Sequence, residues 1–362
     1  MSRVFLKWMA LSGLSLLSAC GGGSSSPSVT AIQANQAVYG QTAQFTLTGA
    51  SLDQGVTVSA QGCQSLSQSS GGTSTSQTWT CLVDAVGTGA VSLEAKTTSG
   101  SVLKVQAFDV AAPANPVIKT LQPDRLMYSQ TSQFTVTGVS LDKDFQLSSR
   151  NCKGLTLLPG GTATSKTVSC SVTGVGTAAV GLDAKLADGT VLKSVSFDVP
   201  APQVTVTTTL GTLVVELNPA VVPVTVDNFL QYVKDKFYDN TIFHRVIAGF
   251  VAQGGWLTPT PAVQAGQRAA IALEVGKGLS NLRGTIAMAR TSELNSATSQ
   301  FFFNLVDNTG LDTGNGGYAV FGKLVQGQDV LDAIGKVSTS TQYGLSDFPV
   351  SNVVVQTAVQ TR

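Results

Sequence analysis

Apolar and polar residues alternate through most of the first two hundred positions of the chain. Residues 44–48 (QFTLT) and 91–95 (VSLEA) show the pattern clearly. A period of two is typical of strands with one buried face, and clusters of Gly and Ser between these runs predict turns. The pattern indicates small antiparallel β-sandwiches, immunoglobulin-like in outline.

The strand-rich region contains one sequence twice. A shift of 89 residues carries Phe45 to Phe134 and Phe108 to Phe197 without a gap, and the same shift aligns two cysteine pairs. A fixed period of this kind is the signature of a tandem duplication. We expect an immunoglobulin-like repeat 1 at 31–112 and repeat 2 at 118–200, joined and followed by short semi-rigid linkers rich in proline.

Residues 203–362 have a different pattern. Alternation at 204–208 and 212–216 around a central Gly211 predicts a hairpin. Apolar residues then recur at helical spacing from Val226 to Phe237, with Thr225 as the expected N-cap. A second short helix is expected from Asp329 to Ile334, ended by Gly335. Further strands are expected at 241–247, 285–290, 300–306, 318–325 and 351–358, which predicts a β-barrel with two helices.

The N-terminus has the features of a processing signal. Arg3 and Lys7 precede an apolar run at 8–17, and small residues lead to Cys20. The run is too short to span a bilayer. An ordinary secretory signal is one interpretation, but the cysteine followed by 21–27 (GGGSSSP) resembles a bacterial lipobox. This resemblance implies a signal peptide at 1–19, lipid on Cys20, a flexible tether at 20–30, and an outer-membrane lipoprotein of the cell envelope. We expect the protein to face the periplasm, with exposure on the cell exterior as the alternative.

The other four cysteines form two pairs with equal spacing, Cys63 with Cys81 and Cys152 with Cys170. Regularly spaced pairs in an exported chain usually form disulfides. A zinc site with four thiolates is the alternative, but neither pair has the close spacing that such sites use. We therefore predict one disulfide in each repeat and no metal.

Composition and charge exclude several classes of protein. The chain has 43% hydrophobic and 12% charged residues, so it is not disordered. Its net charge is +1, and residues 203–362 carry ten Lys and Arg against eleven Asp and Glu. No basic surface for nucleic acid is expected.

Three motifs in the last segment resemble one known family. Residues 243–247 (FHRVI), 249–255 (GFVAQGG) and 299–302 (SQFF) resemble the active-site strands of cyclophilins, the peptidyl-prolyl cis/trans isomerases, or rotamases. Residues 228–230 (NFL), 281–284 (NLRG) and 288–290 (MAR) extend the resemblance over nearly the whole segment. The resemblance implies an eight-stranded barrel with two helices at 203–362. It also implies an enzyme that rotates X-Pro bonds in proline-containing polypeptides during the folding of exported proteins. Such an enzyme needs no cofactor, and we expect it to be a monomer.

The resemblance also implies roles for individual residues. Arg245 would donate a hydrogen bond to the twisted amide, and Gln253 would bind the neighbouring carbonyl. The expected substrate-binding residues are Phe250, Val251, Ala289, Arg290, Gln300, Phe302, Leu311 and Tyr318. Each role has an alternative: Arg245 as an exposed strand residue, and Gln253 as a partner of buried backbone. Alternation in a strand sends Phe302 to one face and its two neighbours to the core.

The only histidine, His244, suggests general-base catalysis, but rotation about an amide needs no base. Alternation turns His244 away from Arg245, so we predict a structural histidine. The chain also departs from the family at Gly310, where cyclophilins commonly have an aromatic residue, and at Tyr318, where many have histidine. Binding of cyclosporin-like ligands is therefore not carried over to this chain.

Two other functions compete with the isomerase. The first is a cyclophilin-fold module, such as a chaperone or adhesin subunit, that binds Pro-containing segments without turnover. The second is a purely structural lipoprotein.

Overall fold

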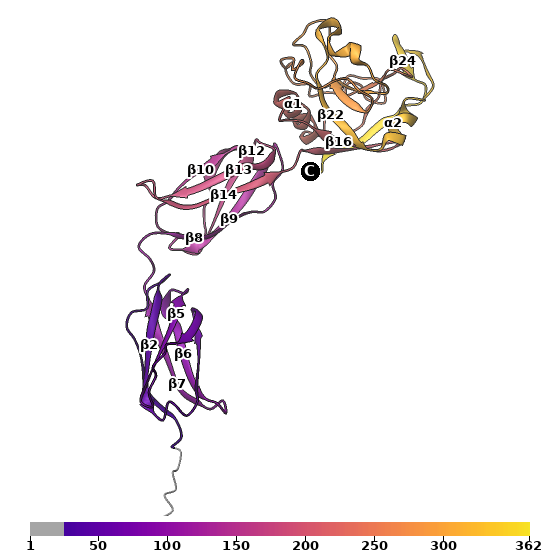
Figure 1. Cartoon of the computed structure of the whole chain (residues 1–362). Coiled ribbons are helices and arrows are strands. Elements are labelled where there is room, and N and C mark those ends of the chain that lie inside the picture. The colour runs from indigo at the N-terminus through magenta and orange to yellow at the C-terminus, as the bar shows by residue number, and fades with distance from the viewer. Residues whose placement is uncertain (1–24) are drawn as a thin grey trace, which may run out of the picture. The chain divides into compact units, whose positions relative to one another are not determined.

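The computed structural model of the protein describes residues 25–362 (Figure 1). The chain divides into two compact units, the first ending at Pro113 and the second running from Ala114 to Arg362. The predicted signal peptide at 1–19 and the predicted lipid-bearing Cys20 lie outside the described residues. No helix within residues 25–362 is long and apolar enough to cross a membrane.

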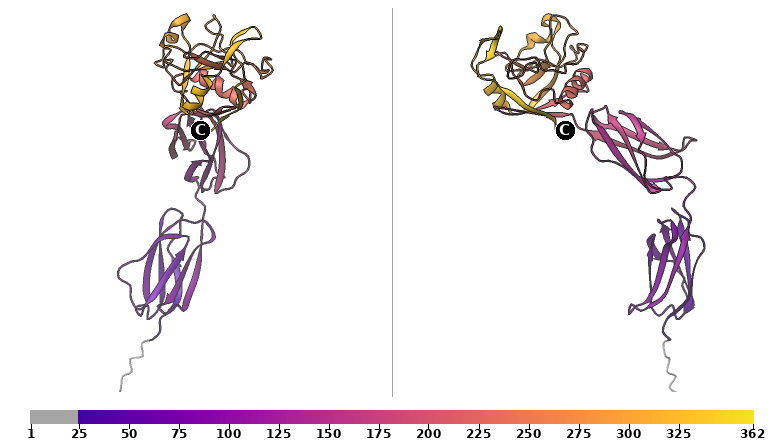
Figure 2. Two further views of the ribbon diagram at one scale, coloured as in Figure 1. Left: turned by 90° about the vertical axis from the view of Figure 1, so that its right-hand side faces the viewer. Right: turned by 180° about the vertical axis from the view of Figure 1, so that it is seen from behind.

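The first unit contains one two-sheet domain (Figure 1, Figure 2). Its strands are β1 (Ser28–Ala34), β2 (Thr42–Ala50), β3 (Val56–Gln61), β4 (Cys63–Gln68), β5 (Ser76–Val83), β6 (Gly87–Thr97) and β7 (Val102–Val110). The sheets have the orders β1-β2-β5-β4 and β3-β6-β7. Apolar residues of the alternating runs, such as Phe45, Leu47 and Leu93, are fully buried between them. β1 begins three residues before the predicted start of the repeat, inside the predicted tether.

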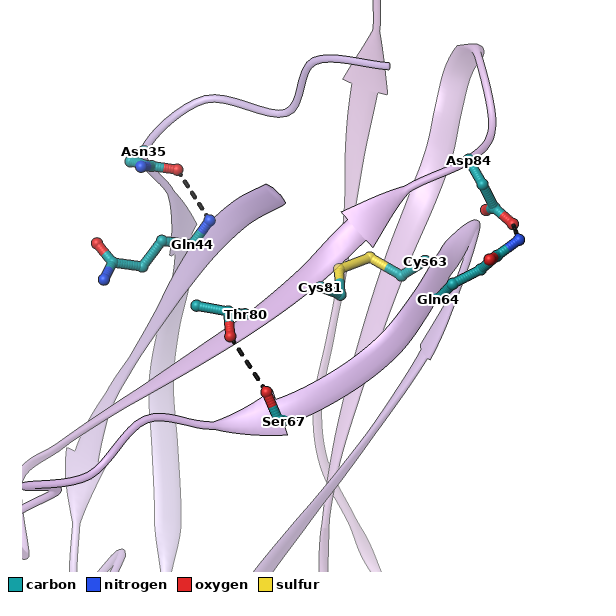
Figure 3. Close-up of a disulfide and its surroundings, with 8 residues drawn as sticks. All are labelled: Asn35, Gln44, Cys63, Gln64, Ser67, Thr80, Cys81 and Asp84. Carbon is teal, nitrogen blue, oxygen red and sulfur yellow. Dashed lines mark hydrogen bonds between the residues drawn. A yellow bond between two sulfur atoms is a disulfide. The ribbon is translucent and has the colours of Figure 1, made fainter. Parts of the chain in front are cut away.

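Each predicted disulfide is present. Cys63 and Cys81 join β4 to β5 with their Cα atoms 5.6 Å apart, and Cys152 and Cys170 make the matching bond with a distance of 5.4 Å. Figure 3 shows the first of these bonds beside the hydrogen bond between Ser67 and Thr80. β4 and β5 are neighbours in one sheet. The bond therefore lies within a sheet, whereas the disulfide of antibody domains joins two sheets.

Repeat 2 has the same strand order. Its strands are β8 (Val117–Pro123), β9 (Thr131–Val139), β10 (Gln146–Arg150), β11 (Cys152–Leu157), β12 (Ser165–Val172), β13 (Gly176–Lys185) and β14 (Val191–Val199). The sheets are β11-β12-β9-β8 and β10-β13-β14. Phe134 and Val136 take the places of Phe45 and Leu47 in the core.

The remaining residues, 203–362, form the C-terminal domain. It contains β15 (Gln203–Thr208), β16 (Gly211–Leu217), α1 (Pro223–Lys234), β17 (Thr241–Ile242), β18 (Arg245–Val246), β19 (Val251–Gly254), β20 (Thr285–Met288), β21 (Phe301–Asn304), the 3₁₀ turns η1 (Thr309–Asp312) and η2 (Gly314–Gly316), β22 (Val320–Gln326), α2 (Gln328–Ile334), β23 (Thr339–Gln342), β24 (Leu345–Pro349) and β25 (Val354–Gln360). α1 and α2 lie on different sides of the strands (Figure 1, Figure 2).

Nine strands form the main sheet of this domain, in the order β17-β25-β15-β16-β22-β20-β21-β19-β18. The expected number of eight is wrong because the single strand expected at 241–247 is two strands. β17 pairs with β25 and β18 pairs with β19, with only Phe243 and His244 between them. Since these two strands are the edges of the sheet, the chain at 241–246 brings the edges together and closes the barrel.

The first helix begins earlier than expected. Pro223 occupies its first turn, and the N-cap residue Val222 makes no side-chain hydrogen bond to the helix. Proline is favourable at this position because a backbone N–H in the first turn has no partner within the helix. Thr225 lies inside the helix, so its prediction as N-cap is wrong. Its backbone N–H and hydroxyl instead donate to the buried Glu274 carboxylate at 2.8 and 2.9 Å. A carboxylate from a distant loop thus satisfies the helix N-terminus.

Repeat 2 is held against the C-terminal domain by polar and apolar contacts. Tyr128 is 3% exposed and belongs to the core of the C-terminal domain, and burial together with the nearby Asp227 of α1 raises the pKa of its hydroxyl. Gln130 and Gln360 bond through their side chains at 2.7 Å, and Arg125 donates to the Thr361 carbonyl at 3.0 Å. Repeat 2 and the C-terminal domain therefore form one packed unit.

The expected linker at 200–202 is part of this contact. The Ala201 carbonyl accepts a hydrogen bond from Arg362 at 2.8 Å, and the Pro202 carbonyl accepts one from the Leu217 backbone at 2.9 Å. Both of these acceptors bind groups of the C-terminal domain. The segment is therefore a fixed connection in this structure.

Candidate active site

A cavity of about 320 Å³ lies on the outer face of the barrel, over β18, β19 and β21. Nine of the ten residues predicted for the site line it, and Asn315 is an additional member. The lining residues are Arg245, Phe250, Val251, Gln253, Ala289, Arg290, Phe302, Leu311, Asn315 and Tyr318. The tenth predicted residue, Gln300, lies beside the cavity and bonds to Gln253.

The apolar floor of the cavity follows from strand alternation in β21. Phe301 and Phe303 point into the barrel core, where Phe301 contacts Phe229 edge to face with ring centroids 5.8 Å apart. Phe302 points outward and packs with Val251 and other residues of the site. β21 is paired on both sides, with β20 and with β19, so its register is fixed. The prediction that only Phe302 faces the cleft is confirmed.

Arg245 and Gln253 are directly opposite each other in the pairing of β18 with β19. Nη1 of Arg245 donates to Oε1 of Gln253 at 3.4 Å, and Nε2 of Gln253 donates to Oε1 of Gln300 at 2.9 Å. The Arg245 side chain is 39% exposed at the cavity. Gln253 therefore bonds to two side chains of the site, and the alternative in which it pairs with buried backbone does not describe this geometry.

Asp347 is a member of the site that the sequence did not reveal. It lies in β24, and its carboxylate is 3.8 Å from Nε of Arg245. Its backbone has a positive φ of 55°, which is uncommon for a residue other than glycine. No motif connects β24 with the arginine a hundred residues earlier, so only the folded chain brings the two charges together.

His244 lies between β17 and β18 and is buried, and it does not line the cavity that Arg245 lines. It is 4% exposed, and its ring meets that of Trp256 edge to face at 5.2 Å. Burial, with a smaller contribution from the Arg245 charge, lowers the pKa of His244 to about 4. Its Nδ1 has no hydrogen-bond partner among the described residues. A neutral, buried ring that does not line the cavity fits a structural residue and not a general base.

Arg290 and Tyr318 form the other wall. The Arg290 guanidinium lies 4.7 Å from the centroid of the Tyr318 ring, and its Nε and Nη2 donate to the Gly317 carbonyl at 3.1 and 2.9 Å. Tyr318 in turn meets Phe302 edge to face at 5.8 Å. The guanidinium thus holds the glycine-rich loop at 313–317 through the Gly317 carbonyl. Arg290 and the Tyr318 ring that it contacts both line the cleft.

The wall is open where the family commonly has an aromatic residue. Gly310 is exposed, and a Cβ added to it would meet no atom within 4 Å. The cleft therefore has apolar surface on the floor, contributed by Phe250, Val251, Phe302 and Leu311, and solvent beside Gly310.

The lining offers hydrogen-bonding groups and apolar contact. The lining residues include no Ser, Cys, His, Asp or Glu, and no cluster of three or more His, Cys, Asp or Glu suited to a metal lies within residues 25–362. An arginine donor beside an apolar seat can hold a ring and stabilise a lone pair or a carbonyl oxygen without forming a covalent bond.

Known proteins resemble the C-terminal domain closely. The family model "Cyclophilin type peptidyl-prolyl cis-trans isomerase/CLD" matches residues 203–360. Peptidyl-prolyl cis-trans isomerase cyp18 of Streptomyces antibioticus is 50% identical over 156 residues, which is 42% of this chain and 93% of that protein. Peptidyl-prolyl cis-trans isomerase B of Escherichia coli is 43% identical over 158 residues, 42% of this chain and 96% of that protein.

A solved structure is also similar. A cyclophilin type peptidyl-prolyl cis-trans isomerase of Cryptosporidium parvum, crystallised in the presence of the dipeptide Ala-Pro, is 30% identical, covers 44% of this chain and 99% of its own, and has a TM-score of 0.38. The sequence relatives are matched over nearly their whole length. This chain belongs to the cyclophilin-type peptidyl-prolyl cis-trans isomerases.

Proposed function

We propose that Arg245 stabilises the twisted X-Pro amide in the cleft and that Gln253 binds a neighbouring carbonyl. Rotation must break amide resonance, with a barrier of about 18–20 kcal/mol. Twisting localises a lone pair on the prolyl nitrogen, and a guanidinium N–H directed at that lone pair or at the proline carbonyl stabilises the twisted state more than the planar one. No nucleophile or proton transfer is needed.

The arrangement of the guanidinium carries this proposal. Nε faces Asp347 and Nη1 donates to Gln253, whereas Nη2 makes no hydrogen bond within residues 25–362. Two sides of the guanidinium are thus held and the third is available to a substrate. Gln253 donates one of its two amide N–H bonds to Gln300, which leaves the other for a substrate carbonyl.

The proline ring would lie on the outward face of β21. Phe302 is 4% exposed and packs with the half-buried Phe250, Leu311 and Tyr318. The ring is apolar and the neighbouring backbone is polar, so the apolar floor and the Arg245–Gln253 edge match the two halves of the substrate. In this role Ala289 and Arg290 border the cleft and Gln300 keeps Gln253 in place.

We further propose that the enzyme assists the folding of exported polypeptides from a lipid anchor on Cys20 at the outer membrane, facing the periplasm, as a monomer. The lipobox-like sequence at 17–20 supports the anchor. The disulfide in each repeat supports an oxidising compartment. In this view the two repeats are immunoglobulin-like modules that carry the isomerase away from the membrane.

Substitution of Arg245 tests the mechanism. We expect Arg245→Ala in the full chain to lower kcat/KM for a short Pro peptide by about 10- to 150-fold, the equivalent of a charged hydrogen bond of about 1.5–3 kcal/mol. Arg245→Lys should recover only part of the rate, since Lys cannot bond to Gln253, Asp347 and substrate in the same plane. Arg283→Ala is the control, because Arg283 is an exposed arginine paired with Asp332 and not a residue of the cleft.

Two results would contradict this mechanism. If Arg245→Ala turns over peptide as fast as the unchanged chain, the assigned role of Arg245 is wrong. If the unchanged chain binds the peptide but matches the uncatalysed rate, the binding module without turnover is the correct function. The anchor is tested separately, because Cys20→Ser should move the protein from the membrane fraction to the soluble fraction of the cell envelope.

A further inference from the structure

A second cavity, larger than the cleft, lies where repeat 2 meets the isomerase domain. Its volume is about 460 Å³. Val175 of repeat 2 forms one wall, and Leu217, Leu279, Leu282 and Val320 of the isomerase domain form the others. We call this cavity, defined by these five residues, the inter-domain groove. Lys323 and Glu216 also line it.

The walls of the inter-domain groove are fixed relative to each other. Val175 packs against the core of repeat 2 and also against the core of the isomerase domain. Ala201, in the connection that Arg362 holds by a hydrogen bond, lines the same cavity. The groove is therefore a preformed feature of the packed unit, which is the usual state of a binding site.

The inter-domain groove lies next to the cleft, although none of the described residues lines both. Val320 and Leu279 line the groove and also pack in the apolar cluster that contains Phe302 and Leu311. Val320 is 5% exposed and lines the groove but not the cleft, so it packs between the two cavities. Packed apolar side chains thus lie between the expected proline-binding floor and the groove. Leu282, which is 45% exposed, contacts solvent on the groove side.

We propose that the inter-domain groove binds a large apolar side chain of the same polypeptide whose X-Pro bond lies in the cleft. This inference rests on the proposed function of the cleft. The occupant is an extended, unfolded segment, because such a segment exposes apolar side chains near a proline and a folded protein buries them. An extended chain advances about 3.3 Å per residue, so a side chain a few positions from the proline can enter the neighbouring groove, which Val320 lines. Repeat 2 then contributes to client binding through Val175.

A peptide series tests the proposal with the full chain. Each peptide has about fifteen residues with one central X-Pro bond in a background of Ser, Ala and Gly, and a single Leu is moved through the positions on both sides. A four-residue peptide with the same X-Pro bond reaches only the cleft. We expect Leu at one position or two neighbouring ones to raise kcat/KM about tenfold, the order expected from burial of one Leu side chain.

Substitutions in the groove must remove this gain and nothing else. Leu282→Asp is the main variant, since an exposed position accepts a charge without loss of folding; it should abolish the tenfold gain and leave turnover of the four-residue peptide unchanged. Val175→Asp tests the other wall. Val86→Asp is its matched control, because Val86 stands 89 residues earlier at the corresponding position of repeat 1; it should retain the gain.

The outcomes separate the two proposals. If no Leu position gives a gain, or if Leu282→Asp retains it, the inter-domain groove does not bind the client. If the four-residue peptide is not turned over, or its turnover does not depend on Arg245, the proposed mechanism of the cleft fails instead.

Discussion

The buried histidine should make folding stability depend on pH between about 4 and 6.5. Burial lowers the pKa of His244 to about 4 in the folded protein, whereas the unfolded chain has the ordinary value of about 6.5. Between these values the unfolded state binds more protons than the folded state, so acidification favours unfolding. Above pH 6.5 both states are neutral at His244, and this residue adds no pH dependence.

The size of the effect follows from the difference in pKa. A shift from 6.5 to about 4 is roughly 2.5 units, and each unit corresponds to about 1.36 kcal/mol. The free energy of unfolding should therefore fall by about 3 kcal/mol from pH 7 to pH 4 through His244 alone. The loss is large compared with the total stability of a typical domain, about 5–15 kcal/mol.

Two measurements test this prediction. His244 is the only histidine in the chain, so its imidazole gives a single NMR signal whose titration should have a midpoint near pH 4. Denaturant unfolding should show that the unchanged chain loses stability relative to His244→Phe by about 3 kcal/mol as the pH falls from 7 to 4, because Phe carries no charge at any pH. Turnover by the unchanged chain should be flat from about pH 5.5 to 8.

Each measurement can contradict the reasoning. A histidine signal that titrates near 6.5 would show that the ring is solvated in the folded protein. Parallel stability curves for the two chains would show that another group causes the acid sensitivity. A step in kcat/KM at the measured pKa of His244, removed by His244→Phe, would restore the general-base alternative.

Three further predictions concern stability and the open wall. Replacing Cys152 and Cys170 by Ser should lower stability by about 3 kcal/mol, the entropy of an eighteen-residue loop; thermal unfolding checks this, and a loss under 1 kcal/mol would contradict it. Glu274→Ala should cost about 1–3 kcal/mol in denaturant unfolding, because Thr225 loses a buried acceptor; an unchanged midpoint would refute the capping role. Gly310→Trp should lower KM for Pro peptides by about fivefold or more, because the added ring enters open space; an unchanged or higher KM would show that the site does not need this wall.

The parts of the site that the sequence predicted are local in the chain. Alternation along a strand fixes which face each residue occupies, so the outward Phe302 and the inward Phe301 and Phe303 could be read from the pattern. The same rule predicted that His244 turns away from Arg245; His244 does not line the cavity, but it lies between β17 and β18 and not within a strand. The cysteine spacing predicted both disulfides because the partners lie in neighbouring strands of a hairpin.

The parts that the sequence did not predict depend on contacts between distant segments. Asp347 approaches Arg245 only because β24 returns to the cleft. Glu274 serves α1 from a loop 49 residues away from Thr225, so the expected cap was placed two residues inside the helix. The composition of 241–247 predicts one continuous strand, because it carries no sign that the chain changes partner between β17 and β18.

The same packing accounts for both the barrel core and the cleft. Catalysis without a covalent step depends on the position of the catalytic groups, so the Arg245 guanidinium and the apolar floor around Phe302 must keep a fixed distance from each other. Phe301 and Phe303 hold β21 from inside through contacts with Phe243, and this fixes the outward direction of Phe302. Arg245 is positioned by the pairing of β18 with β19. Because β19 pairs with β21 as well, one set of paired strands fixes the distance between the Arg245 guanidinium and the Phe302 ring. A shift of one residue in this pairing would turn both side chains away from the substrate.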